Sequence, residues 1–285
     1  MSGKSAASTE TENHIDLRAS PRHPPKVNGA GNHLVIGEGG QIESQIVISG
    51  DNNRLTIGEN SRVSGFTPSG AGAALADPRQ TPSVNLTIQG CGNTVEIAPD
   101  CKLAATLTIM GDNNHLRIDR ECTINGFVNL LSPTGSTLNV GAGTTMVQVS
   151  IQLHEPGEIT FGEDCMVSSQ VYVSISDIHP IYDRATGDRI NAAASIMIGN
   201  HVWLGLRSMI MKGAVIGDGA VVAAGAILSG HAPANTIMAG VPARLVRENI
   251  VWRRELSEGP PEPVILTEAP RRGWWPFAFV RRKPV

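Results

Sequence analysis

A histidine followed by a proline, His179-Pro180, is the residue pair in this sequence best suited to acid–base chemistry. It lies in a polar stretch, 176–191, that also contains Asp177 and Asp183. The proline biases His179 toward an extended backbone, which would hold its imidazole in one direction. An imidazole can accept a proton from a hydroxyl near neutral pH, and either aspartate could orient the ring. The stretch therefore predicts a general base presented on a loop.

Aliphatic residues recur at every sixth position directly after this loop. They are Ile198, Leu204, Ile210, Ile216, Val222 and Leu228. A helix would return its apolar face every three or four residues, whereas an even spacing fits short strands separated by turns. Three such segments, about 18 residues, would form one turn of a triangular parallel β-helix whose coils stack at strand spacing. The predicted fold is all-β, and this regular part would position the loop.

A longer repeat precedes the loop. In each unit of this repeat, a Gly/Asn-rich turn leads into a strand in which apolar and polar residues alternate. The aliphatic residues that close these strands are Ile36, Ile57, Ile97, Ile118, Val140 and Phe161. Most gaps between them predict coils of about 21 residues, each a hexapeptide turn with a bulged corner. The gap from Ile57 to Ile97 is close to two coils and contains a predicted loop, 67–82. The gap from Phe161 to Ile198 is one coil plus the insertion that carries His179.

The chain divides into three predicted parts. Residues 1–27 are rich in Ser, Thr, Glu, Pro and Lys and are expected to form a flexible tail. Residues 28–245 form the β-helix, with the loop 67–82 and a catalytic loop, 176–195. Residues 246–285 contain a short helix at 249–257, a Pro/Glu-rich linker and a tail rich in Trp and Arg. We expect that tail to pack on the column or a neighbouring subunit; a membrane or polyanion contact is less favoured.

Composition narrows the functional class. The chain has 285 residues, 41% of them hydrophobic and 4% aromatic, which suits a narrow aliphatic core. The net charge of −3 provides no overall positive potential that would attract nucleic acid. There is no long apolar run and no leader-like amino terminus, so a cytoplasmic protein is expected. Cys101, Cys122 and Cys165 share one small-residue position of the repeat, which predicts buried reduced thiols, while Cys91 lies on a turn.

Four segments, in order and spacing, resemble the left-handed β-helix acyltransferases that use acetyl-CoA. They are His179-Pro180, Ile198-Gly199-Asn200-His201-Val202-Trp203-Leu204-Gly205, Ile216-Gly217-Asp218-Gly219-Ala220 and Ala239-Gly240-Val241-Pro242-Ala243-Arg244. The sequence is most similar to the sugar O-acetyltransferases, which include enzymes for galactosides, maltose, capsular polysaccharide and sialic acid. The resemblance covers about residues 165–252, and the left hand of the coil is taken from it.

The resemblance implies roles for particular residues. His179 would be the general base, and Trp203 would flank the same site against substrate or thioester. The acyl donor would be acetyl-CoA, bound in a groove between two subunits of a homotrimer. The residues that match donor-binding positions are Gly205, Leu206, Ala224, Ser229, Gly230, Arg244 and Arg247. The loop residues expected to contact the sugar or polysaccharide acceptor are Asp177, Tyr182, Asp183, Arg184 and Asn191. Two of the donor-binding positions depart from the family's pattern: Leu206 stands where a small polar residue is common in the family, and Gly230 stands where a Lys is common.

Three other functions compete with O-acetylation. N-acetylation of an amino sugar would use the same fold and donor. A β-helical carbonic anhydrase would need three converging zinc-binding histidines, but only His179 and His201 lie suitably near each other in the sequence. A non-catalytic scaffold would explain the long amino-terminal column and not the motifs around His179. We therefore predict an acetyltransferase without a metal.

Overall fold

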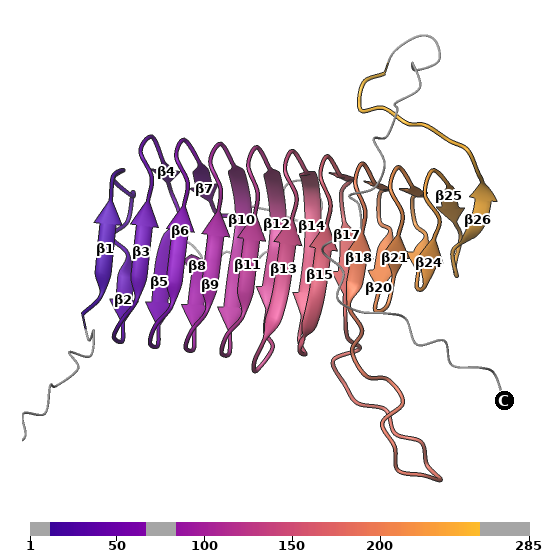
Figure 1. The fold of residues 1–285 in the computed structure, drawn as a ribbon, viewed down its shortest axis with the longest axis horizontal. Coiled ribbons are helices and arrows are strands. Elements are labelled where there is room, and N and C mark those ends of the chain that lie inside the picture. Colours follow the sequence, from indigo (N-terminus) through magenta and orange to yellow (C-terminus); the bar gives the residue numbers. More distant parts are fainter. Residues whose placement is uncertain (1–11, 67–83, 257–285) are drawn as a thin grey trace, which may run out of the picture. The chain divides into compact units, whose positions relative to one another are not determined.

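The computed structural model describes residues 12–66 and 84–256, and this part of the chain contains strands and no helix. One compact unit extends to Ile250, and a second begins at Val251. Within the first unit, successive coils stack so that the strands form a parallel β-helix with three faces (Figure 1). The all-β, parallel solenoid predicted from the six-residue spacing is confirmed.

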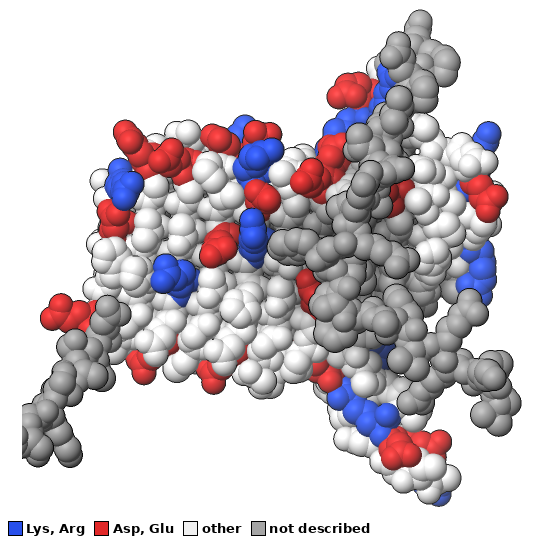
Figure 2. Space-filling view, in the orientation of Figure 1, with Lys and Arg blue, Asp and Glu red and all other residues white. Residues whose placement is uncertain are grey.

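Face 1 is a ten-stranded sheet that occupies the front of Figure 1. Its strands are β1 (His14–Leu17), β3 (His33–Ile36), β6 (Arg54–Ile57), β9 (Thr94–Ile97), β11 (His115–Ile118), β13 (Ser136–Val140), β15 (Gly157–Phe161), β18 (Ile196–Ile198), β21 (Val215–Ile216) and β24 (His231–Ala232). Charges of both signs lie on this side (Figure 2). Arg117 of β11, for example, lies next to Glu96 of β9 in the strand register.

The chain passes from face 1 to face 2 and then to face 3 in every complete coil. Face 2 contains β4 (Gln41–Ile42), β7 (Arg62–Ser64), β16 (Met166–Val167), β19 (Trp203–Leu204), β22 (Val221–Val222) and β25 (Ile237–Ala239). Face 3 contains β2 (Lys26–Asn28), β5 (Gln45–Ser49), β8 (Val84–Gln89), β17 (Val171–Ser174), β20 (Met209–Met211) and β23 (Ile227–Leu228). Three longer strands bend from face 2 onto face 3, namely β10 (Lys102–Met110), β12 (Thr123–Leu130) and β14 (Thr145–Leu153).

The six-residue spacing corresponds to buried columns inside the coil. Ile198 pairs with Ile216, and Leu204 pairs with Val222, each one coil apart. All six aliphatic residues of the repeat are 3% exposed or less. Because one coil buries little by itself, these columns gain stability only through stacking. The hexapeptide prediction for 198–228 is therefore confirmed residue by residue.

Polar ladders inside the corners complete the stacking. Asn53 and Asn93 belong to a buried ladder in which each backbone N–H donates to the side-chain oxygen of the asparagine one coil earlier, at 2.9–3.1 Å. The thiols of Cys101, Cys122 and Cys165 lie at another corner, buried and reduced, and point to carbonyl oxygens of the next coil. The prediction for these three cysteines is confirmed, and Cys91 is exposed on its turn.

Two upstream predictions were wrong. Ile57 pairs directly with Ile97, so this gap is one coil and not two. The additional chain lies between β7 and β8, where the predicted loop 67–82 falls outside the described residues. The column also begins before residue 28, because β1 pairs with β3 and β2 with β5. The four-residue strand β1 is too short for the sequence pattern to detect, while 1–11 lies outside the described residues.

The carboxyl-terminal end differs from prediction as well. After Leu228 the coil shortens and continues, since Ile216 pairs with Ala232 and Val222 with Met238. Strand β26 (Arg244–Arg247) then pairs antiparallel with β25. Residues 249–256 form no helix: Asn249 has φ 53°, outside the right-handed helical region, and so short a segment is not helical without packing. The predicted linker and Trp/Arg-rich tail beyond 256 lie outside the described residues.

Candidate active site

The predicted catalytic loop leaves the β-helix after β17 and returns at β18, at the edge between faces 3 and 1. Phe161 still pairs with Ile198, so the insertion does not disturb the column. Its distal part is a hairpin-like arm in which Tyr182 and Arg189 form an antiparallel bridge and Ile190 N–H donates to Ile181 O at 2.9 Å. The arm extends away from the coils (Figure 1). The predicted insertion is therefore a structured loop.

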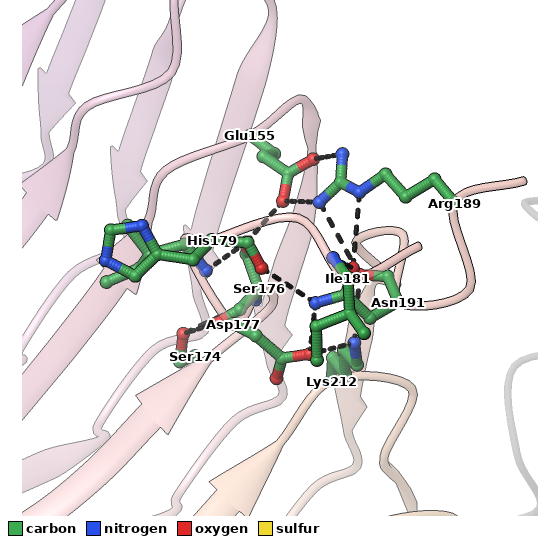
Figure 3. A network of polar contacts seen from close by, with 10 residues as sticks. Glu155, Ser174, Ser176, Asp177, His179, Ile181, Arg189, Asn191 and Lys212 are labelled. Carbon is green, nitrogen blue, oxygen red and sulfur yellow. Dashed lines mark hydrogen bonds and ion pairs between the residues drawn. The ribbon is translucent and has the colours of Figure 1, made fainter. Parts of the chain in front are cut away.

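His179 lies near the base of this loop and is exposed. Its backbone N–H donates to Asp177 O at 2.7 Å, which tightens the chain ahead of Pro180. In Figure 3 its imidazole is turned away from the polar contacts around it. Neither ring nitrogen makes a hydrogen bond to another residue within 12–66 or 84–256. Both nitrogens are thus open to a substrate hydroxyl.

Asn191 holds the backbone on both sides of Pro180. Its Nδ2 donates to His179 O at 2.9 Å, and its Oδ1 accepts from Ile181 N–H at 2.7 Å. The same Nδ2 donates to Asp177 Oδ2 at 3.0 Å. Asn191 is only 7% exposed, unlike its neighbours in the loop. The amide therefore fixes the backbone that carries the imidazole.

An ion pair ties the loop to the preceding coil. Arg189 donates from both terminal nitrogens to the Glu155 carboxylate at 2.6 and 2.7 Å, and Ser176 Oγ donates to the same carboxylate. The Arg189 guanidinium, followed by the Ser176 hydroxyl, lowers the pKa of Glu155 to about 2. Glu155 accordingly stays ionised across the neutral and mildly acidic range.

A second ion pair ties the loop to the following coil. Lys212, just after β20, donates to Asp177 Oδ2 and to Asn191 O, the latter at 3.0 Å. The Lys212 ammonium and then the Asn191 amide lower the pKa of Asp177. Figure 3 shows both ion pairs converging on the base of the loop. The loop is thus anchored on two coils at once.

The expectation that Asp177 or Asp183 orients the imidazole was wrong. Asp177 uses its carboxylate for Lys212 and Asn191. Asp183 accepts hydrogen bonds from the N–H groups of Ala185 and Thr186 in its own turn, which lowers its pKa. Backbone N–H groups of its own turn occupy the carboxylate of Asp183. Lys212 of the following coil binds the carboxylate of Asp177.

The predicted acceptor residues separate into two groups. Asp177 and Asn191 lie beside His179 at the base of the loop. Tyr182 and Arg184 are exposed on the arm, where Asp183 shapes the turn. The structure therefore brings two of the five next to the histidine and leaves three on the projecting arm.

Trp203 lies on another face of the coil. It begins β19 on face 2, between Met166 and Val221 of the adjacent strands, whereas His179 lies at the edge between faces 3 and 1. The indole N–H donates to Ser168 Oγ at 3.2 Å, and the side chain is half-buried. One chain therefore presents the predicted base and the predicted tryptophan on different sides of its column.

The predicted donor-binding residues occupy three places. Gly205, Leu206 and Ala224 lie at the edge between faces 2 and 3, where a Cβ on Gly205 would come within 2.6 Å of the Ala224 backbone nitrogen. Ser229 and Gly230 are exposed at the edge between faces 3 and 1, on the turn from β23 to β24. Arg244 and Arg247 are exposed at the two ends of β26. Face 3 separates the first two groups.

Sequence reasoning missed Glu155, Ser176, Arg189 and Lys212 as parts of the site. The coil length contained a signal for two of them, because Glu155 and Ser176 are 21 residues apart and so lie at neighbouring corners. Lys212 has no such signal, because Asn191, which it contacts, lies inside the insertion and outside the repeat. Nothing in the local sequence marks Arg189, since its position depends on how the arm folds back.

Two further findings concern the described residues as a whole. Within 12–66 and 84–256, no group of three or more His, Cys, Asp or Glu side chains is arranged to hold a metal ion. The same residues contain no helix long and apolar enough to cross a membrane.

Comparison with known proteins places this chain in a family. Residues 195–230 match the family model described as bacterial transferase hexapeptide (six repeats). The chain is 37% identical over 178 residues to a polysialic acid O-acetyltransferase of Neisseria meningitidis, covering 62% of this chain and 82% of that protein. It is also 37% identical over 140 residues to a polysialic acid O-acetyltransferase of Escherichia coli O1:K1 / APEC, covering 49% of this chain and 45% of that protein.

Solved structures agree with these matches. The crystal structure of the polySia specific acetyltransferase NeuO has a TM-score of 0.54 and 26% identity, covering 85% of this chain and 89% of that one. The polysialic acid O-acetyltransferase OatWY has a TM-score of 0.52 and 26% identity, covering 84% and 95%. The predicted left-handed β-helix is thereby confirmed. The chain is an acyltransferase and belongs to the hexapeptide-repeat, left-handed β-helix family of sugar and capsular polysaccharide O-acetyltransferases.

Proposed function

We propose that this protein transfers an acetyl group from acetyl-CoA to a hydroxyl of a surface polysaccharide, with His179 as the general base. The observation that carries the proposal is the exposed imidazole of His179 on a loop whose backbone is fixed by Asn191. A base must be held within hydrogen-bond reach of the proton it removes, and its nitrogens must be available. The fixed backbone and the exposed imidazole support this role for His179. The relatives named as polysialic acid O-acetyltransferases favour a polymeric sugar acceptor.

The reaction would proceed in one active site. A ring nitrogen of His179 accepts the proton of the acceptor hydroxyl while the oxygen attacks the thioester carbonyl. A carbon–oxygen bond forms, the carbon–sulfur bond of the thioester breaks, and the proton held by the imidazole passes to the departing CoA sulfur. The products are the sugar acetate and CoA thiol. General-base catalysis of this kind contributes about 10²–10⁴-fold to the rate.

We also propose that each active site lies between two subunits of a homotrimer. His179 and Trp203 lie on different sides of one column, so Trp203 of a neighbouring copy is better placed to complete the site. In a cyclic oligomer one edge of each subunit meets a different face of the next, which suits this arrangement. The Ser168 hydroxyl would hold the indole in a fixed orientation.

In this proposal, the donor binds along the edges formed by the short hexapeptide coils. Leu206 and Ala224 at one edge, and Ser229 and Gly230 at the other, would contact the pantetheine arm. Arg244 and Arg247 are exposed guanidinium groups and would neutralise the nucleotide phosphates. Because Gly230 supplies no cation, these two arginines would contribute most of the charge. Use of acetyl-CoA implies that the reaction takes place in the cytoplasm.

The test of this function is acetyl transfer from labelled acetyl-CoA to a panel of acceptors. The panel should contain polysialic acid, neutral capsular polysaccharides, galactosides and amino sugars. We expect base-labile O-acetyl ester on a polysaccharide and stoichiometric release of CoA. Label in a base-stable amide would support N-acetylation instead, and absence of transfer and of acetyl-CoA binding would support a scaffold.

A further inference from the structure

The hydrogen bonds of Asn191 leave little capacity for a substrate. Both Nδ2 protons have partners, at Asp177 Oδ2 and His179 O. The Oδ1 atom accepts from Ile181 N–H at 2.7 Å and from Arg189 Nε at 3.4 Å. With 7% of its surface exposed, the residue is enclosed by its own loop. These contacts disagree with its predicted role as an acceptor-binding residue.

The same contacts place Asn191 at the point where the two ion pairs meet. Lys212 Nζ, from the following coil, donates to Asn191 O at 3.0 Å. Arg189, held by Glu155 of the preceding coil, lies against Asn191 Oδ1 and O at 3.4 and 3.5 Å. The coils are stacked strands with fixed register. Asn191 is therefore located by two coils rather than by the loop alone.

The His179-Pro180-Ile181 segment has few other restraints. Pro180 has no N–H to donate, and His179 uses its own N–H for Asp177 O. The carbonyl of His179 accepts a hydrogen bond from the Asn191 side chain, and the N–H of Ile181 donates one to it. Loss of that amide would remove the bonds nearest the proline on both sides, and leave only His179 N–H to Asp177 O and Ile190 N–H to Ile181 O.

We propose that Asn191 is a positioning residue for His179, acting through the backbone of the His-Pro segment and not through contact with the acceptor. This inference rests on the proposed role of His179 as the base. Misplacement of a reacting group by about 1 Å can cost about 10²-fold in rate. Asn191 makes no hydrogen bond to a predicted donor-binding residue, so it would affect the chemical step while leaving the contacts to the donor in place.

The first experiment compares Asn191→Ala with Asn139→Ala in the full chain. Asn139 lies on β13 in face 1, and its amide donates to Glu158 at 3.1 Å, so its loss removes a similar bond outside the loop. We expect Asn191→Ala to lower kcat by about 10- to 100-fold. KM for acetyl-CoA should change by less than about twofold, because donor contacts persist. Asn139→Ala should keep the wild-type kcat.

The second experiment separates positioning from simple stability. In Asn191→Asp the new carboxylate faces Asp177, which should lower both Tm and kcat. Adding Asp177→Asn restores a hydrogen bond between the two side chains with donor and acceptor exchanged, but it also removes the carboxylate that pairs with Lys212, so Asp177→Asn alone is the reference. The double variant still lacks a donor for His179 O. We therefore expect it to recover the Tm of Asp177→Asn and to keep a kcat well below that of Asp177→Asn.

The outcomes distinguish the possible failures. A wild-type kcat in Asn191→Ala, or recovery of kcat together with Tm in the double variant, would overturn the positioning role. His179→Ala serves as the reference for the base itself. If His179→Ala were fully active, the proposed function of the loop would fail first, and the positioning inference would fail with it.

Discussion

Phe161 and Ile198 are paired in adjacent strands of face 1 although the whole predicted catalytic loop lies between them in the sequence. Both side chains are at most 3% exposed. The column therefore continues through the insertion without a change in register, and we expect the stability of the fold to be separable from the proposed chemistry of the loop.

Excision of the loop tests this separation. In the next coil, Lys212 and Gly213 alone connect Met211, which pairs with Ser174, to Ala214. Replacing residues 175–195 by Lys-Gly should therefore close the coil at the same register. We expect a cooperatively folded protein with no acetyl transfer, measured by thermal unfolding and by CoA release. A variant that retained transfer would contradict the assignment of the base to this loop, and one that failed to fold would contradict the separation.

Much of the fold was predictable because the repeat itself carries the information. Each aliphatic residue of 198–228 occupies an equivalent position in successive coils, so spacing alone specified the buried column. The small residues at Cys101, Cys122 and Cys165 followed from the same register. Strand β1 and the single coil from Ile57 to Ile97 were missed, because one is short and the other is interrupted by additional chain.

The candidate site was predictable only in part. His179 followed from its residue type and the proline after it, and its exposed imidazole agrees with that prediction. Its surroundings depend on contacts between coils, such as Glu155 with Arg189 and Asp177 with Lys212, which local sequence does not encode. The position of Trp203 on another face follows from the order of faces around the coil, and a linear spacing does not reveal it.

The Glu155–Arg189 pair should make the loop dependent on pH in a defined direction. The pKa of Glu155 falls from 4.5 to about 2 in the folded protein, so its stabilising contribution is fully present above pH 4.5. The contribution is lost as pH falls from 4.5 toward 2. The difference in Tm between wild type and Glu155→Gln should therefore be constant from pH 5 to pH 8 and shrink below pH 4.5.

Activity supplies an independent measurement on the same variant. Because the loop loses one of its two anchors, Glu155→Gln should lower kcat at neutral pH by about tenfold. Glu43→Gln breaks an exposed pair with Arg62 far along the column and should keep the wild-type kcat. An equal kcat in wild type and Glu155→Gln, or a Tm difference that grows on acidification, would contradict this account of the anchor.

Mixing of inactive subunits tests whether the site is shared between copies. His179→Ala and Trp203→Ala should each be inactive alone. The two variants are then dissociated, mixed in equal amounts and reassembled. In the mixture, about one quarter of the sites should combine an intact histidine from one subunit with an intact tryptophan from its neighbour, so we expect about one quarter of wild-type activity. A mixture that stayed inactive despite proven subunit exchange would mean that both residues act within one chain, and a Trp203→Ala variant that was active alone would mean that Trp203 has no part in the site.

The most direct measurement of the central claim is the rate of acetyl transfer by His179→Ala at saturating acetyl-CoA and acceptor. If His179 is the general base, kcat should fall by at least about 10²-fold, while acetyl-CoA affinity and Tm remain at the wild-type values. A His179→Ala variant that transfers acetyl at the wild-type rate would contradict the account.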